Sequence, residues 1–220
     1  YLVAYQNTGT RVFTGDLNNG EVSVPLEYNA SAEKWEYEPG WNLLGNPYPS
    51  AIDWSEANLD LFAENFVHIY DRYKDGGAGY ITIGDGSEHG NVIRANQGFF
   101  VLVDGDPSDQ DFSFNNDMRV HGGAFMKESN SVTESLRLRL SGGEYYDETT
   151  IRIAENSGYE RDRRDARKLM SFASYVPQLF SYTSDNVSVA INSIPEIDQE
   201  KTIALGARIP GDGQYTLSVS

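Results

Sequence analysis

The sequence contains no cysteine, and this absence removes several classes of site at once. Without thiols there is no disulfide framework, no thiolate metal site and no cysteine nucleophile. Positive charge is also scarce, because 17 Lys and Arg stand against 33 Asp and Glu, which leaves a net charge of -16. Proteins bind a phosphate backbone through cationic side chains. We therefore expect no nucleic-acid partner.

Long apolar runs are missing as well. No window of about 18 apolar residues occurs, so we expect no segment that spans a bilayer. Residues 1–5 lack the basic and apolar regions of a secretory signal, and like residues 214–220 they have the pattern of a strand. We therefore expect the chain to be an excerpt of a longer polypeptide, with any catalytic domain or sorting signal located elsewhere in it.

The sequence contains many short runs in which apolar and polar residues alternate. Val22, Val24 and Leu26 share one face of a strand expected over residues 21–28, and Pro25, which has no N–H to donate, favours a sheet edge for it. Similar runs between Gly, Asn, Asp and Pro clusters are found at residues 11–14, 34–37, 41–44, 66–70, 80–83, 98–103, 136–140, 151–153, 187–191 and 203–209. This spacing predicts an all-β fold of two consecutive antiparallel β-sandwich domains, jelly-roll or immunoglobulin-like.

A polar stretch without periodicity, residues 127–131, divides the chain. We predict an acidic sandwich over residues 1–126 and a second sandwich over residues 132–220. Charge supports the division, because 19 acids and 6 bases precede residue 125, whereas 14 acids and 11 bases follow from there on. The second region has fewer expected strands than a closed sandwich, so we expect its C-terminal strands to be missing.

Only two short stretches favour helical structure: residues 53–62, for which we predict a turn or two, and residues 160–170. The second contains a cluster of basic residues with interleaved acids, which predicts a salt-bridged helix that faces solvent. The alternative is that Asp165 and Lys168 anchor this helix to the sheet. In either case we expect a structural role for the cluster.

Several short motifs occur in an order that resembles a known family. The run Trp41-Asn42-Leu43-Leu44-Gly45-Asn46-Pro47-Tyr48-Pro49 resembles a motif of large secreted Bacteroidota proteins, in the region ahead of the C-terminal sorting domain read by the type IX secretion system. The resemblance continues through Gln97-Gly98-Phe99-Phe100-Val101, Arg119-Val120-His121, Asp165-Ala166-Arg167-Lys168-Leu169, Pro177-Gln178-Leu179, Ala190-Ile191-Asn192, Leu205-Gly206 and Gly213-Gln214-Tyr215. The ordered set covers nearly the whole chain, although each piece alone is a weak signal.

The resemblance implies a fold and an export route, because such regions accompany very different catalytic or adhesive domains. We expect a non-catalytic accessory or structural module, secreted or attached to the cell surface outside the outer membrane, whose partners are other domains of the same polypeptide. A carbohydrate-binding module that uses exposed aromatics of the first domain is the alternative. A part of a polysaccharide-degrading enzyme is the third interpretation.

The candidate ligand-binding residues are aromatic and close together in sequence. Sugar binding needs exposed planar rings on which a pyranose can stack. The candidates for a polysaccharide partner are Trp35, Tyr37, Trp41, Tyr48 and Trp54. Burial in the sandwich core is the competing interpretation, because large aromatic side chains dominate such cores.

The candidate metal ligands are the carboxylates of one acidic loop, Asp104, Asp106, Asp109 and Asp111. Oxygen ligands of this kind suit a structural Ca²⁺. The spacing does not match an EF-hand loop, and a solvated hairpin loop is the competing interpretation. No other cofactor is expected.

Catalytic motifs are absent. His68, His89 and His121 are scattered, and no serine-hydrolase, zinc-peptidase or phosphate-loop motif occurs. His68 shares a predicted strand face with Phe66 and Tyr70, which favours a packed histidine over a ligand. We therefore expect no catalytic residues in this chain.

Overall fold

The computed structural model describes residues 14–28, 39–72, 74, 76–105, 111–120, 134–196 and 200–219. In these ranges the chain is all-β, with strands joined by turns and three single-turn 3-10 helices, which confirms the predicted fold class. Within the same ranges, no helix has the length and apolar character needed to cross a membrane. The runs predicted at residues 11–13 and 34–37 and the predicted linker at 127–131 lie outside the described residues, so the domain boundary stays a prediction.

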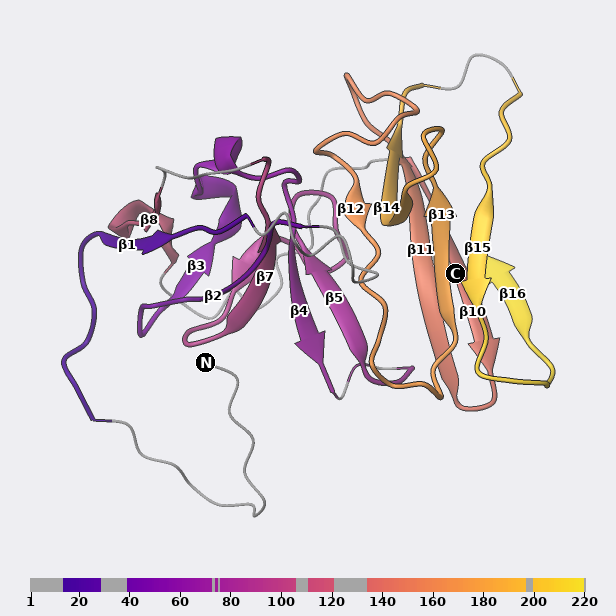
Figure 1. The fold of residues 1–220 in the computed structure, drawn as a ribbon, viewed down its shortest axis with the longest axis horizontal. Coiled ribbons are helices and arrows are strands. Elements are labelled where there is room, and N and C mark those ends of the chain that lie inside the picture. Colours follow the sequence, from indigo (N-terminus) through magenta and orange to yellow (C-terminus); the bar gives the residue numbers. More distant parts are fainter. Residues whose placement is uncertain are drawn as a thin grey trace.

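The described residues up to 120, the N-terminal half, form three small antiparallel sheets (Figure 1). A two-stranded sheet pairs β1 (Val22–Pro25) with β8 (Asp111–Phe114). A four-stranded sheet has the order β2 (Trp41–Gly45), β7 (Gly98–Leu102), β4 (Val67–Asp71) and β5 (Gly79–Ile83). In the third sheet β3 (Ala51–Asp53) lies between β6 (Val92–Ile93) and β9 (Arg119–Val120).

An aromatic core fills the space between these sheets. Strand alternation places Phe99 and Val101 of β7 inside, both fully buried. Trp54 lies at the centre, with its ring centroid 5.6 Å from that of Phe99 and 5.4 Å from that of Phe62. Other fully buried members of this core include Tyr48, Ile52, Phe112, Phe114 and Met118. The N-terminal half therefore has a continuous core of its own.

The described residues from 134 onward, the C-terminal half, form one larger sheet. Its order is β15 (Leu205–Arg208), β13 (Gln178–Tyr182), β14 (Ser188–Ile194), β11 (Tyr145–Ile153), β10 (Ser135–Gly142) and β16 (Thr216–Val219), and β12 (Ala166–Arg167) pairs with β14. The pairing of β11 with β14 is parallel, so this half is not purely antiparallel as predicted. β14 pairs with β13 through Ser188 and Val189 and with β11 through Ile191 to Ile194.

The two stretches expected to be helical have different outcomes. Residues 53–62 form two single turns, η2 (Trp54–Glu56) and η3 (Leu59–Leu61), which confirms the predicted turn or two, while η4 (Asn116–Met118) lies later in the chain. Residues 160–170 contain turns and β12 instead of a helix. The reason is local, because Asp162 Oδ1 accepts from Arg164 N at 2.7 Å and Asp165 Oδ2 from Asp162 N at 2.8 Å. Such side-chain bonds compete with helical hydrogen bonding.

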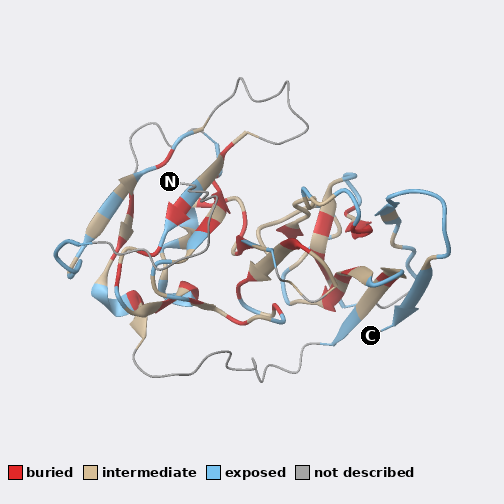
Figure 2. Ribbon diagram, turned by 90° about the horizontal axis from the view of Figure 1, so that it is seen from below, coloured by how far each residue is buried: buried red, intermediate tan, exposed pale blue. Residues whose placement is uncertain are grey.

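Burial is unequal along the chain (Figure 2). The strands near the centre of each half contain most buried residues, whereas β16 is exposed along its whole length. A mainly apolar cleft of about 470 Å³ opens beside β10, lined by Leu136, Leu138, Ile151, Ile194 and Leu205 among others. The C-terminal half is thus less closed than the N-terminal half.

Candidate functional site

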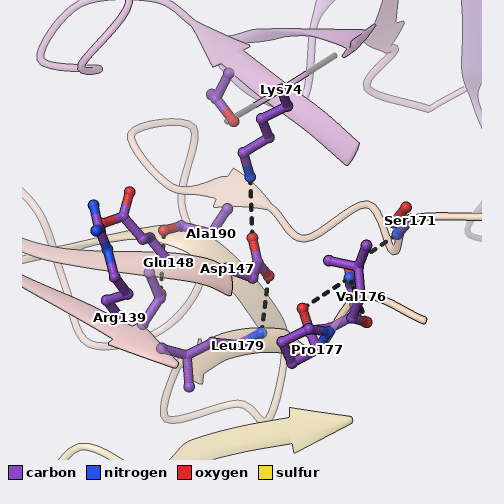
Figure 3. A network of polar contacts seen from close by, with 12 residues as sticks. Lys74, Arg139, Asp147, Glu148, Ser171, Val176, Pro177, Leu179 and Ala190 are labelled. Atoms are coloured by element: carbon purple, nitrogen blue, oxygen red, sulfur yellow. Dashed lines mark hydrogen bonds and ion pairs between the residues drawn. The ribbon is translucent and has the colours of Figure 1, made fainter. Parts of the chain in front are cut away.

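A cluster of largely buried charged groups lies where the two halves meet, and we call this contact the junction (Figure 3). Asp147 of β11 is buried, and its Oδ1 lies 3.1 Å from Nζ of Lys74 in the N-terminal half. Its Oδ2 accepts from the main-chain N–H of Leu179 at 2.8 Å and contacts Nζ of Lys168. A single carboxylate therefore binds partners from three separate segments.

Burial and charge act against each other on these groups. Burial works to raise the pKa of Asp147, but the ammonium groups of Lys168 and Lys74 outweigh it, so the pKa is lowered. Burial lowers the pKa of Lys168, although Asp147 opposes the shift. The Asp147 carboxylate is consequently ionised at neutral pH, and it neutralises positive charge that would otherwise be buried unpaired.

Arginine side chains of the C-terminal half attach to main-chain carbonyl oxygens of the N-terminal half. The donor–acceptor distances are 2.9 Å from Arg161 Nη2 to Ala63 O, 2.9 Å and 2.8 Å from Arg163 Nη2 to Leu59 O and Phe62 O, and 2.7 Å from Arg152 Nη1 to Asp85 O. Two of these arginines belong to the basic cluster predicted to form a solvated helix. The cluster has the structural role that was expected, but it acts across the junction.

Asp165 and Lys168 both hold this segment to the sheet, as in the alternative interpretation, but through different partners. Asp165 Oδ1 accepts from Ser193 N at 2.7 Å, while Lys168 contacts Asp147. Burial raises the pKa of Asp165 to about 6. The anchoring alternative was thus correct, while the helical geometry was not.

A buried histidine and carboxylate form a second polar contact at the junction. His68 of β4 is 1% exposed, which confirms the predicted packed histidine. Its Nε2 lies 2.6 Å from Oε1 of Glu64, which is also fully buried. The other carboxylate oxygen of Glu64 accepts from Arg167 N of the C-terminal half at 2.9 Å. Sequence reasoning missed Glu64, because no pattern marks a lone acid before a strand as buried.

Apolar packing and close main-chain approach complete the junction. Phe66 of the N-terminal half packs with Ala166 and Ile191 of the C-terminal half in one buried cluster. Tyr146 N donates to Gly76 O at 2.8 Å, and the Tyr146 ring covers Gly76 so closely that a Cβ there would lie 2.6 Å from it. The junction is therefore a packed interface with polar groups inside it.

The structure corrects part of the aromatic prediction. Tyr48 and Trp54 are 0% and 1% exposed, so neither can present a ring face to a sugar. Trp41 is half-buried, and its ring centroid lies 5.4 Å from that of His68. Trp35 and Tyr37 lie outside the described residues. Burial in the core, the competing interpretation, therefore holds for Tyr48 and Trp54.

A different set of aromatic side chains is partly exposed. Tyr70 of β4 and the half-buried Tyr80 of β5 meet edge to face with ring centroids 5.2 Å apart, and Phe172 of the C-terminal half lies 5.7 Å and 6.1 Å from them. Phe172 is 71% exposed. Alternation could not have indicated that Tyr70 is exposed, since it places Tyr70 on the same strand face as the buried Phe66 and His68. Phe172, from a distant segment, carries no signal of exposure either.

The acidic loop is only partly described. Asp104 and Asp111 are exposed, while Asp106 and Asp109 lie outside the described residues. Among the residues that the structure covers, no three His, Asp or Glu side chains are grouped to hold a metal ion. A structural Ca²⁺ at this loop therefore stays a prediction.

Comparison with known proteins gives one partial match. A family model described as a domain of unknown function (DUF8693) matches residues 2–72. These residues include β1 to β4 and end before Lys74, the first residue of the Asp147 cluster. No curated protein and no solved structure matches the chain.

Proposed function

We propose that this chain is a non-catalytic structural module of a larger bacterial protein that is secreted or attached to the cell surface. Its role is to hold neighbouring domains of the same polypeptide at a fixed separation outside the cell. The order of family motifs in the sequence supports the export by type IX secretion that belongs to this proposal.

The observation that carries the proposal is that the buried ionisable groups are paired with other parts of the chain. Asp147, Lys168 and Glu64 are the kind of buried charged groups that often mark active sites. Here each of them binds a main-chain group or a counter-ion from another segment. These charged groups are paired in contacts that join parts of the chain. Such contacts support a stiff spacer.

A replacement experiment in the parent protein tests the spacer role. The module is exchanged for a flexible Gly/Ser linker of equal residue number, and the neighbouring domain is assayed in solution and on intact cells. We expect unchanged activity in solution and reduced access to a surface-immobilised substrate. Saturable hydrolysis of a polysaccharide by the isolated chain would overturn the proposal.

The export route has a separate test. The parent protein is expressed in a Bacteroidota host with and without a functional type IX system. The proposal predicts its loss from the medium and cell surface when the system is disabled, with accumulation inside the cell. Undiminished export from the disabled host would show that the motif order has misled us about the route.

Carbohydrate binding is a second candidate, which the exposed rings of Tyr70 and Phe172 favour, with the half-buried Tyr80 beside them. Aromatic faces and edges at a surface can stack on pyranose rings. The isolated chain should then bind a marine or plant polysaccharide saturably, and Phe172→Ala should weaken binding at least tenfold. Leu217→Ala, an exposed apolar change on β16, is the control. If the chain binds none of a set of marine and plant polysaccharides, carbohydrate binding is removed as a candidate and the spacer role remains.

A further inference from the structure

Lys168 and Asp147 place an amine and a carboxyl group in direct contact inside the folded protein. Their side chains are 7% and 5% exposed. They lie 21 residues apart in sequence, one on β11 and the other directly after β12. The main chain holds both ends, because Lys168 N donates to Ser188 O at 3.1 Å and Leu179 N donates to Asp147 at 2.8 Å.

We propose that Nζ of Lys168 and Cγ of Asp147 join in an intramolecular amide bond. In the first step a proton passes from the Lys168 ammonium to Oδ2 of Asp147, which gives a neutral amine and a carboxylic acid. The amine nitrogen then attacks Cγ. A second proton from the nitrogen goes to Oδ2, which leaves as water, while Oδ1 remains as the amide oxygen. An ammonium and a carboxylate thus become one amide and one water, with no other reactant.

The surroundings favour this reaction at several points. A site poor in water disfavours the ion pair relative to the neutral pair, and burial lowers the pKa of Lys168, which favours the nucleophilic amine. Lys74 Nζ lies 3.1 Å from Oδ1, where negative charge develops in the tetrahedral intermediate. Lys74 is thus a positioning residue that stabilises this oxygen.

Space for the leaving water lies beside the pair. A small cavity of about 80 Å³ is lined by Lys74, Asp147 and Lys168 together with Glu148 and His89. A water molecule needs only ~10–15 Å³ of such space and a few polar partners. The released water can therefore leave Cγ without displacing the core.

Lys168 is better suited to the attack than Lys74. The Lys74 side chain is 20% exposed, so water stabilises its ammonium form, whereas the Lys168 amine is enclosed. The inference goes beyond the proposed spacer role and does not depend on it. For a chain without cysteine, such a bond would be a covalent cross-link of the kind that disulfides provide elsewhere.

Intact-mass spectrometry of the purified, denatured full chain tests the bond directly. We expect a mass about 18 Da below that calculated from the sequence, the loss of one water, in most molecules. A protease digest should contain one branched peptide that joins the segments around Asp147 and Lys168. The full sequence mass in folded wild-type protein, with no branched peptide, would overturn the proposal.

The masses of substituted variants test whether the lost water comes from Lys168 and Asp147. Lys168→Arg and Asp147→Ala should each show the full mass, while Arg137→Ala, a change at an exposed ion pair, should keep the loss. If Lys168→Arg and Asp147→Ala fail to fold, the presence or absence of the branched peptide in wild type still tests whether the amide bond forms. Lys74→Met should slow the appearance of the bond by about 100-fold after refolding, with Lys74→Arg close to wild type. Water loss that persists in Lys168→Arg would place the reaction elsewhere and contradict the assignment.

Discussion

Asp147 is the residue on which the junction depends most, because its carboxylate binds Lys74, Lys168 and the N–H of Leu179. Transfer of a charged group out of water costs several kcal/mol. At this site two ammonium groups and a main-chain donor offset that cost. A buried cluster of paired charges adds little net stability compared with apolar packing. Loss of one charge is nevertheless costly, because it leaves the others buried and unpaired.

In a Lys168→Arg background, which cannot form the proposed amide, replacement of Asp147 by alanine should lower the free energy of unfolding by about 3–5 kcal/mol, because two buried cationic groups lose their counter-ion. Guanidinium denaturation measures the change. The matched control is Arg137→Ala, whose ion pair with Glu88 is exposed at 34% and 52% and should contribute less than about 1 kcal/mol. Similar small losses in both variants would show that the junction does not depend on Asp147.

Asp165 gives the protein a specific pH dependence. Burial raises its folded-state pKa from 3.8 to about 6, so the folded state holds this proton more tightly than the unfolded chain. Its contribution to stability is therefore fully present below about pH 4 and is lost as the pH rises through 6. About two pKa units correspond to about 3 kcal/mol.

The measurement compares wild type with Asp165→Asn, which keeps the side-chain shape but cannot ionise. The difference between their unfolding free energies should change by about 3 kcal/mol between pH 4 and pH 7, with wild type losing stability relative to the variant. A difference that stays constant across this range would mean that Asp165 titrates normally in the folded state.

At the scale of elements, the loop between β4 and β5 determines how closely the halves approach. Gly76 has φ +87° and lies under the ring of Tyr146 at the start of β11. Only glycine fits, because a Cβ would meet the ring and the left-handed backbone disfavours other residues. The loop and β11 are thus matched in shape as well as joined by a hydrogen bond.

Comparison of Gly76→Ala with Gly105→Ala separates the cost of the left-handed backbone from the cost of overlap with the Tyr146 ring. Gly105 also has positive φ, at +73°, but a Cβ there would meet nothing within 4 Å, so alanine should cost about 1–2 kcal/mol. At Gly76 overpacking against Tyr146 should add about 1–3 kcal/mol. Thermal or urea unfolding compares the two. Equal costs would indicate that Tyr146 yields without loss and that the contact is loose.

Several strands were predictable and the structure of residues 160–170 was not, for one physical reason. Alternation is a local signal, so β2, β4 and β7 could be identified from residues 41–44, 66–70 and 98–103. In residues 160–170 charge spacing suggested a helix, but Arg161 and Arg163 bind carbonyl groups about a hundred residues away. Such long-range partners leave no trace in the local pattern.

The candidate site was predictable only in its parts. The structural role of Asp165 and Lys168 could be inferred from the basic cluster, and the packed state of His68 from its strand. Glu64, Lys74 and Asp147 could not, because their burial results from the meeting of two halves. The aromatic prediction failed at Tyr48 and Trp54 because composition cannot distinguish a core ring from a surface ring.

At the scale of the whole molecule, buried contacts join the two halves, and we predict that the halves unfold as one body. Phe66 belongs to a buried cluster with Ala166 and Ile191, so part of the C-terminal core comes from the N-terminal half. Figure 1 shows the β4–β5 hairpin at the boundary, where the Asp147 cluster also lies. Loss of either half would expose this cluster and leave buried charges unpaired.

Urea unfolding followed by two signals tests this claim most directly. All three tryptophans, at positions 35, 41 and 54, precede the junction, so their fluorescence reports on the N-terminal half, whereas far-UV circular dichroism reports on both halves. The account predicts transitions with the same midpoint and slope, as for a single cooperative unit. Two separate transitions, with fluorescence changing at a different urea concentration from circular dichroism, would contradict it.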